Sequence, residues 1–433
     1  MSIRRSLVPG SLIFLLFIWG IGHGLVAGEV EVHPSHPIRG LNLDWPDVTY
    51  ITWVDAVTRH QWVATLGLQI FDNHRHRRPS YADEFPDEDT SESPYGTYLL
   101  VARIDDSGRI VMRAQRLIPG AIFIGVHYAR VRTLDPWADD DECAFIVTSD
   151  FQRFYCYNQY LDRLGRFRLQ QRVLAFDVYP TEEGKKALLI FQKRADGWLH
   201  LLDPKTGQVL RSWMTTREVR EAIKKQIRKS EKTAVLDFFK DPSHDVMESP
   251  NVVLVVQPPL IIGVVARKAN FFFMVDNRNI KQIRSFPLKL KVPPTKIIAG
   301  PGFSLENAFP ATNEKPFAKR IWLYGSVNIL TEVSEIARIH PGYFIRAKER
   351  YGDVRHRTIA SLPSLIELDV RRGRAKWIQS GIMDMDGNRF YQPDIVTVKK
   401  QNVLYGVMNV YQLDPLKFRS YLGSLLLTGH TDE

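Results

Sequence analysis

The sequence predicts an all-β fold, a β-propeller of about seven blades (six to eight) with one helical insertion. Short apolar runs rich in β-branched and aromatic residues alternate with turn residues along most of the chain. A hairpin-like unit recurs with a period of about 40–50 residues. Only residues 215–241 show clear helical periodicity. A four-stranded sheet cannot bury both of its apolar faces alone, so packing such sheets in a ring explains the period.

The clearest copy of the recurring unit is Gly197–Trp213, which reads as strand, turn and strand. Its turn is Asp203-Pro204-Lys205-Thr206-Gly207, in which proline presets φ, aspartate bonds the local backbone and glycine accepts a positive φ. Similar units centre on Asp276, Asp369 and Asp414. Looser ones centre on Asp55, Asp105, Asp162 and Asn328. The widest interval, from 203 to 276, contains the helical stretch.

The Asp203 and Asp369 units resemble the repeat of the quinoprotein-like (PQQ-type) β-propeller superfamily. Asp203, Thr206 and Gly207 match its Asp-x-x-Thr-Gly pattern, and Asp369, Gly373 and Trp377 match it at the other end. Arg211 stands where the pattern has tryptophan, and Arg372 stands where it has threonine. Catalytic members carry a vicinal disulfide and acidic calcium ligands, whereas the two cysteines here are far apart. The resemblance therefore implies a propeller that binds no cofactor.

A second fold stays open on the residues alone. Asp-x-x-x-Gly is also an ordinary hairpin turn, and two packed β-sandwich domains would show similar turns and strands.

The N-terminus predicts export. Arg4 and Arg5 precede an apolar run over 11–19, and the small residues Val26-Ala27-Gly28 follow. This order is typical of a signal peptide, which we place at 1–28; an uncleaved membrane anchor is the alternative. We therefore expect a secreted or extracytoplasmic protein, in a periplasm or a secretory-pathway lumen.

The rest of the chain divides into two parts. Residues 29–47 contain proline and histidine without a periodic pattern and are expected to form an N-terminal linker. Residues 48–433 are expected to form the propeller domain. A loop excursion at 72–95 carries a basic block followed by an acidic block.

The two cysteines of the chain, Cys143 and Cys156, are expected to form a disulfide. Exported chains favour paired cysteines, and a hairpin turning near Asp150 would bring these two together. The alternative is two buried free thiols.

The helical stretch carries the most concentrated charge. Residues 217–232 hold seven Lys and Arg against three Glu. Thr215 and Glu218 have capping-box spacing, and Val219, Ile223 and Ile227 form one apolar stripe. A possible surface for an anionic partner comprises Arg220, Lys224, Lys225, Arg228 and Lys229. A membrane surface is a second possible partner, and a simple solvated face is the alternative reading.

Other patterns argue against enzymes and nucleic-acid binding. The net charge of +10 is spread over the whole chain, so we do not expect a nucleic-acid partner. No nucleophile elbow, dinucleotide loop or P-loop occurs. The acidic run 135–142 fits no calcium-loop spacing, and we expect neither a metal nor a cofactor. We predict a non-enzymatic binding or scaffold protein that engages another protein; the alternative is a propeller-type carbohydrate-active hydrolase or lyase.

Overall fold

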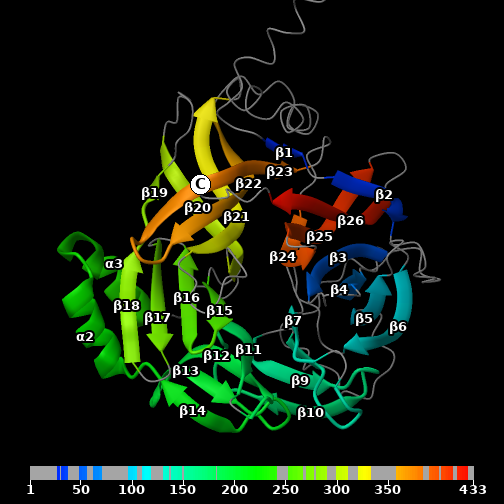
Figure 1. Cartoon of the computed structure of the whole chain (residues 1–433), viewed down its shortest axis with the longest axis horizontal. Helices are drawn as coiled ribbons and strands as arrows, with labels where there is room; N and C mark the ends of the chain where they lie inside the picture. The colour runs from blue at the N-terminus through cyan, green and yellow to red at the C-terminus, as the bar shows by residue number, and fades with distance from the viewer. Residues whose placement is uncertain are drawn as a thin grey trace, which may run out of the picture.

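The computed structural model describes most of the chain in ordered segments (Figure 1). These are residues 27–29, 31–37, 48–55, 62–70, 96–104, 110–118, 130–135, 138–148, 151–181, 183–240, 252–266, 270–276, 279–289, 299–310, 320–332, 357–383, 390–398, 401–412 and 417–427. Within them the chain is all-β apart from two helices, as predicted. Neither of these helices has the length and apolar character required to cross a membrane. The expected loop excursion 72–95 and residues 1–26 of the expected signal peptide 1–28 lie outside the described segments.

The strands form six sheets that follow one another along the chain. Sheet 1 contains β3 (Val48–Asp55), β4 (Trp62–Ile70), β5 (Gly96–Ile104) and β6 (Ile110–Ile118). Sheet 2 contains β7 (Arg130–Thr133), β8 (Phe145–Thr148), β9 (Arg153–Tyr157) and β10 (Arg163–Arg168). Sheet 3 contains β11 (Ala175–Pro180), β12 (Lys186–Arg194), β13 (Gly197–Leu202) and β14 (Val209–Trp213).

The second half of the chain repeats this plan with two additions. Sheet 4 contains β15 (Val252–Gln257), β16 (Leu260–Ala266), β17 (Asn270–Asp276) and β18 (Asn279–Ser285). Sheet 5 contains β20 (Ala299–Pro310), β21 (Arg320–Glu332), β22 (Arg357–Asp369) and β23 (Arg374–Met383), with β1 (Ala27–Glu29) and β19 (Leu288–Lys289) parallel to β23. Sheet 6 contains β24 (Phe390–Val398), β25 (Gln401–Gln412), β26 (Lys417–Leu427) and β2 (Glu31–Pro37).

The last sheet is completed by the other end of the chain. β2 pairs antiparallel with β26, with Glu31 opposite Ser424. The expected linker 29–47 therefore contributes a strand, which corrects the prediction for this part of it. Its prolines suggested a loop, but β2 is an edge strand, where proline is tolerated because one side makes no ladder bonds.

The six sheets are arranged about a common centre, with the first strand of each sheet towards that centre (Figure 1). Neighbouring first strands contact each other in the order β3, β7, β11, β15, β20 and β24, and β24 contacts β3 again. An ion pair joins two of them, since Arg132 of β7 lies 3.5 Å from Asp177 of β11. Among the described segments the contacts between first strands therefore run in a complete cycle of six sheets, the lower end of the expected range of six to eight.

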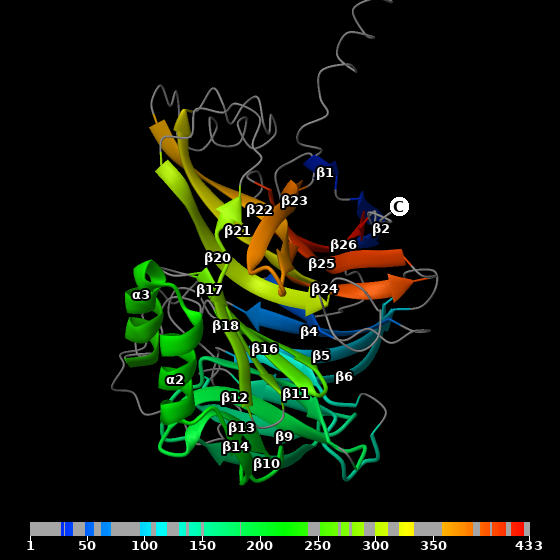
Figure 2. The same cartoon turned by 60° about the vertical axis from the view of Figure 1, so that its left-hand side comes forward.

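The apolar cores lie between neighbouring sheets. Phe154 of sheet 2 and Ile190 of sheet 3 share one core, and Phe272 of sheet 4 and Phe303 of sheet 5 share another. The predicted helical insertion contains two helices, α2 (Thr216–Gln226) and α3 (Lys229–Lys240). Both flank sheet 4 on one side of the molecule (Figure 2) and add side chains to the core between sheets 3 and 4.

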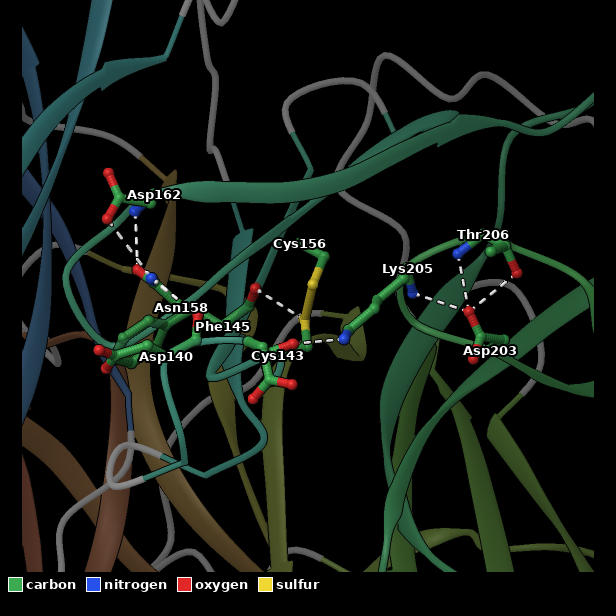
Figure 3. The surroundings of a disulfide bond; sticks show 10 residues. Asp140, Cys143, Phe145, Cys156, Asn158, Asp162, Asp203, Lys205 and Thr206 are labelled. Atoms are coloured by element: carbon green, nitrogen blue, oxygen red, sulfur yellow. Dashed lines mark hydrogen bonds between the residues drawn. A yellow bond between two sulfur atoms is a disulfide. The ribbon is translucent and has the colours of Figure 1, made fainter.

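The Asp203 turn connects β13 to β14 and packs this hairpin against the preceding sheet, sheet 2. Asp203 Oδ1 accepts hydrogen bonds from the amides of Lys205 (3.0 Å) and Thr206 (2.8 Å), as Figure 3 shows. Gly207 has φ +70°, and its amide donates to the Asp203 carbonyl at 2.9 Å. A Cβ at Gly207 would lie 2.4 Å from the Phe167 ring of sheet 2. Glycine is thus required both by φ and by the close approach.

The Asp369 turn repeats this geometry between sheets 5 and 4. The amide of Gly373, at φ +63°, donates to the Asp369 carbonyl at 2.8 Å. The Arg372 amide donates to Asp369 Oδ1 at 2.9 Å. A Cβ at Gly373 would lie 3.0 Å from the Ser285 carbonyl of β18. Two distant copies of one sequence pattern therefore perform the same packing role.

Some of the looser centres do not mark this hairpin. Asp162 and Asp203 lie between the third and fourth strands of their sheets, and Asp276 and Asp369 are the last residues of a third strand. Asp55 instead ends a first strand and Asn328 lies inside β21. In sheet 6 the fourth strand is β2, so the hairpin that would follow a third strand does not exist there. Asn328 and Asp369 both belong to sheet 5, so the eight centres do not mark eight separate sheets. Asp105 and Asp414 lie outside the described residues.

Candidate anionic-partner surface on the helical insertion

The start of α2 follows from its capping box. Thr215 is the N-cap, and its Oγ1 accepts a hydrogen bond from the Glu218 amide at 3.3 Å. Glu218 Oε2 in turn accepts from the Thr215 amide at 2.8 Å. Two backbone donors at the start of the helix are satisfied in this reciprocal way, as the spacing predicted.

One face of α2 is fixed to the sheets. Val219, Ala222 and Ile223 are buried in the core between sheets 3 and 4, followed by Ile227. Gln226 Oε1 accepts a hydrogen bond from the Ile283 amide of β18 at 2.7 Å. β18 is the edge strand of sheet 4, so this contact covers an otherwise open backbone edge. The helix is thereby held by apolar packing and by a side-chain bond to the sheet.

The cations predicted from the sequence lie on the outer face of α2, in the break that follows it and at the start of α3. All five residues of this basic face are exposed: Arg220, Lys224, Lys225, Arg228 and Lys229. Their side chains make no ion pair or hydrogen bond with other described residues. Arg217 differs, because it pairs with Glu221 at 2.9 Å. The basic face therefore presents charge that the protein does not itself neutralise.

Three of these charges lie on α2 itself. Arg220 and Lys224 are four residues apart, which corresponds to a rise of about 6 Å along the helix, and Lys225 follows. Ile227 is extended and ends the helix, so Arg228 lies in the break before α3 and Lys229 is the first residue of α3. Such a cluster creates a local positive potential that attracts an anionic partner.

Cys143 and Cys156 are joined by a disulfide in sheet 2, with their Cα atoms 5.6 Å apart (Figure 3). Both residues are buried, and they belong to the core shared with sheet 3. Cys143 lies two residues before β8, and Cys156 lies in β9, where it is opposite Ile146 of β8. Its burial makes it a structural link and removes it from any exposed reactive surface.

The acidic run beside this disulfide is an exposed loop. Asp139, Asp140, Asp141 and Glu142 are all exposed, and Asn158 Nδ2 donates to the Asp140 carbonyl at 3.0 Å (Figure 3). No group of three or more His, Cys, Asp or Glu residues in the described segments has the geometry of a metal site.

One cluster was missed in the sequence. Asp196, His200 and Ser212 lie together on sheet 3, and they are the residue types of a hydrolase triad. Their order differs from a triad: Ser212 Oγ donates to Asp196 Oδ2 at 2.6 Å, and His200 Nε2 faces the Gln192 carbonyl at 3.0 Å. In a triad the histidine lies between serine and aspartate. The hairpin predicted over Gly197–Trp213 pairs β13 with β14 and places His200 opposite Ser212, so its register could have indicated this cluster.

No protein-family model matches the chain, and no curated protein matches it. Among solved structures, a protein of unknown function from Dyadobacter fermentans is 8% identical, with 93% of this chain and 99% of that chain covered and a TM-score of 0.38. A candidate exo-β-1,3-galactanase from Bifidobacterium bifidum is also 8% identical, with 77% and 92% covered and a TM-score of 0.33.

A third structure, a protein of unknown function from Bacteroides caccae, is 11% identical, with 66% and 77% covered and a TM-score of 0.31. At these scores the similarities transfer neither a fold nor an activity to this chain.

Proposed function

We propose that the six sheets are the blades of a β-propeller and that the protein is an exported, non-enzymatic binding or scaffold protein. It engages another protein whose contacting surface is acidic. The cyclic contacts of the first strands and the pairing of β2 with β26 support the propeller. The resemblance to quinoprotein-like propellers agrees with it and stays a prediction.

The observation that carries the proposed function is the basic face formed by α2 and the start of α3. Three exposed cations without partners stand on α2, whose opposite face is buried in the core, and Arg228 and Lys229 follow at the break before α3. The helix backbone that carries them is already packed against the core and needs no ordering on binding, which favours recognition of a complementary surface.

A protein partner fits this face better than a lipid bilayer. Helices that lie in a membrane interface bury an apolar face in the lipid. The apolar residues of α2 already face the protein core. The exposed large apolar side chains in the described segments are Tyr160 and Leu210, which lie on neither helix. The basic face therefore offers charge and hydrogen-bond donors but no apolar anchor.

Nothing in the described residues favours the hydrolase or lyase alternative. Asp177 lies on β11, a first strand. First strands line the common centre, where a glycoside hydrolase would have its catalytic acid and base. It is ion-paired with Arg132 and accepts a hydrogen bond from the Val178 amide at 2.9 Å. These contacts engage the Asp177 carboxylate in the packing of sheet 2 against sheet 3.

The proposal is tested by charge reversal with a matched control. The test variant carries Lys224→Glu and Lys225→Glu, and the control carries Arg168→Glu and Lys185→Glu, which are exposed residues on other elements. Both change the net charge equally. We expect cross-linking pull-down from the native compartment to capture one acidic protein with wild type and control. Capture by the test variant falls roughly tenfold or more. Equal capture by all three, or no captured protein, overturns the proposal.

A further inference from the structure

The helical insertion is attached to β18, the edge strand of sheet 4, through both of its helices (Figure 2). The Ile283 amide donates to Gln226 Oε1, at the end of α2, at 2.7 Å. Ser285 Oγ, two residues further along β18, donates to Glu231 Oε2 in the first turn of α3. The end of α2, the start of α3 and the cations between them therefore lie beside residues 283–285.

The Asp369 turn of sheet 5 reaches the same part of β18. Arg284 Nη1 donates to the carbonyl of Arg371, in this turn, at 2.6 Å. Gln282 Nε2 donates to the carbonyl of Val370 at 2.9 Å. The insertion and the Asp369 turn are far apart in the sequence, yet both contact the same short stretch of one strand.

The residues that make this contact add positive charge to it. Arg284, Arg371 and Arg372 are exposed. Within the described segments no acidic side chain pairs with Arg284 or Arg371, whereas Arg372 Nε lies 3.7 Å from Asp369 Oδ2. These three arginines and the five cations of the basic face surround the end of β18. We call the eight residues together the composite basic surface.

Two carboxylates interrupt the composite basic surface and restrict what can bind it. Asp369 stands beside Arg372, and Glu231 contacts Ser285, the neighbour of Arg284. A nucleic acid brings phosphates at short, regular intervals, so some of them would face these carboxylates. A peptide can place an acidic residue opposite an arginine and a neutral residue opposite a carboxylate. The charge pattern therefore favours a protein segment.

We propose that the composite basic surface binds one acidic segment of the partner protein, which crosses from the helical insertion over β18 to the Asp369 turn. This inference rests on the proposed function and extends its binding site to a second sheet. The two ends of the surface differ in chemistry. A guanidinium such as that of Arg371 can hold a carboxylate through two parallel hydrogen bonds, whereas a lysine ammonium acts as a point charge.

Binding of a defined acidic peptide tests the extent of this surface. The probe is a fluorescein-labelled peptide of about 16 residues with alternating Glu and Ser, which spans about 50 Å when extended. Fluorescence anisotropy measures its Kd for the full chain at low salt, where surface charges are least screened. The test variant is Arg371→Glu. The control is Lys185→Glu, which changes the net charge equally at an exposed residue of sheet 3.

We expect Arg371→Glu to raise the Kd of the probe roughly threefold or more, because it replaces an attraction by a repulsion. Lys185→Glu should leave the Kd close to that of wild type. The contact with Arg284 uses the carbonyl of Arg371 and not its side chain, so the variant keeps that hydrogen bond. Arg371→Gln removes the charge without adding another and should give a smaller increase, which serves if Arg371→Glu does not fold.

Equal Kd values for the Arg371 variants and Lys185→Glu overturn the proposal, as does a wild type that does not bind the probe. Tighter binding of a single-stranded oligonucleotide of equal charge, weakened by Arg371→Glu, would also overturn it by assigning the surface to nucleic acid.

The variant with Lys224→Glu and Lys225→Glu separates this inference from the proposed function. If that variant loses the probe and the Arg371 variants do not, binding is confined to the insertion and only the extension to sheet 5 fails. If the Arg371 variants lose the probe but the pull-down captures no protein, the composite surface stands and the proposed function fails.

Discussion

Replacing Gly207 with alanine tests the packing role of the recurring Asp turn. Two separate terms oppose this substitution. The backbone has φ +70°, and a residue with a Cβ in this region costs about 1–2 kcal/mol. The new Cβ would also lie 2.4 Å from Cγ and Cδ2 of Phe167. Overpacking of this kind adds about 1–3 kcal/mol, so we expect a loss of about 2–5 kcal/mol in unfolding free energy.

The Phe167 ring has little room to move away. It stacks on Phe154 with ring centroids 5.3 Å apart and an interplanar angle of 10°. Phe154 is itself fully buried in the core between sheets 2 and 3. A tilt of Phe167 would disturb this stack. The clash between the new Cβ and the Phe167 ring is therefore expected to lower the unfolding free energy beyond the backbone term.

Gly184 supplies the matched control. Its φ is +80°, but no atom lies within 4 Å of the position of an added Cβ. Gly184→Ala should therefore show only the backbone term of about 1–2 kcal/mol. Urea unfolding followed by circular dichroism compares the midpoints of the two variants. The reasoning is refuted if both variants lose the same stability, or if Phe167→Leu does not restore part of the stability lost in Gly207→Ala.

Three further predictions concern other parts of the fold. Thr215→Ala removes the hydroxyl that caps α2 and should lower stability by about 1 kcal/mol, whereas Thr233→Ala, at an exposed position inside α3, should change it little in the same unfolding assay. Cys156→Ser opens a link of sequence separation 13 and should cost about 3 kcal/mol; titration of the denatured wild type without reductant should find no free thiol, and two would contradict the disulfide. Deleting residues 31–37 uncovers β26 as an edge strand and should cause association visible by light scattering, so a deletion variant that stays monomeric and equally stable would argue against closure by β2.

Features that depend on a few neighbouring residues were predictable from the sequence. The Asp203 turn follows from residue types that favour a tight turn, and its copy at Asp369 has the same geometry. The cap at Thr215 and the apolar stripe of α2 follow from spacing along one helix. Within the candidate site, all five cations are exposed, and their binding of an anionic partner stays a prediction.

Features that join distant segments required the tertiary structure. Pairing of Glu31 with Ser424 depends on where two ends of the chain meet, and no local pattern encodes it. The last of the six sheets reaches four strands only through this pairing, because β2 is its fourth strand. The lack of partners for the basic face and the contacts of His200 depend on burial and on register between strands.

The amino-acid sequence alone thus determined the strand-rich fold class, the turn chemistry and the helical stretch carrying the cations, because propensity and periodicity act over a few residues. The tertiary structure decided how many sheets the described strands form, how the last one is completed and which polar groups meet around His200. Those outcomes depend on contacts between residues far apart in the chain, whose side chains share a core or a hydrogen bond only after folding.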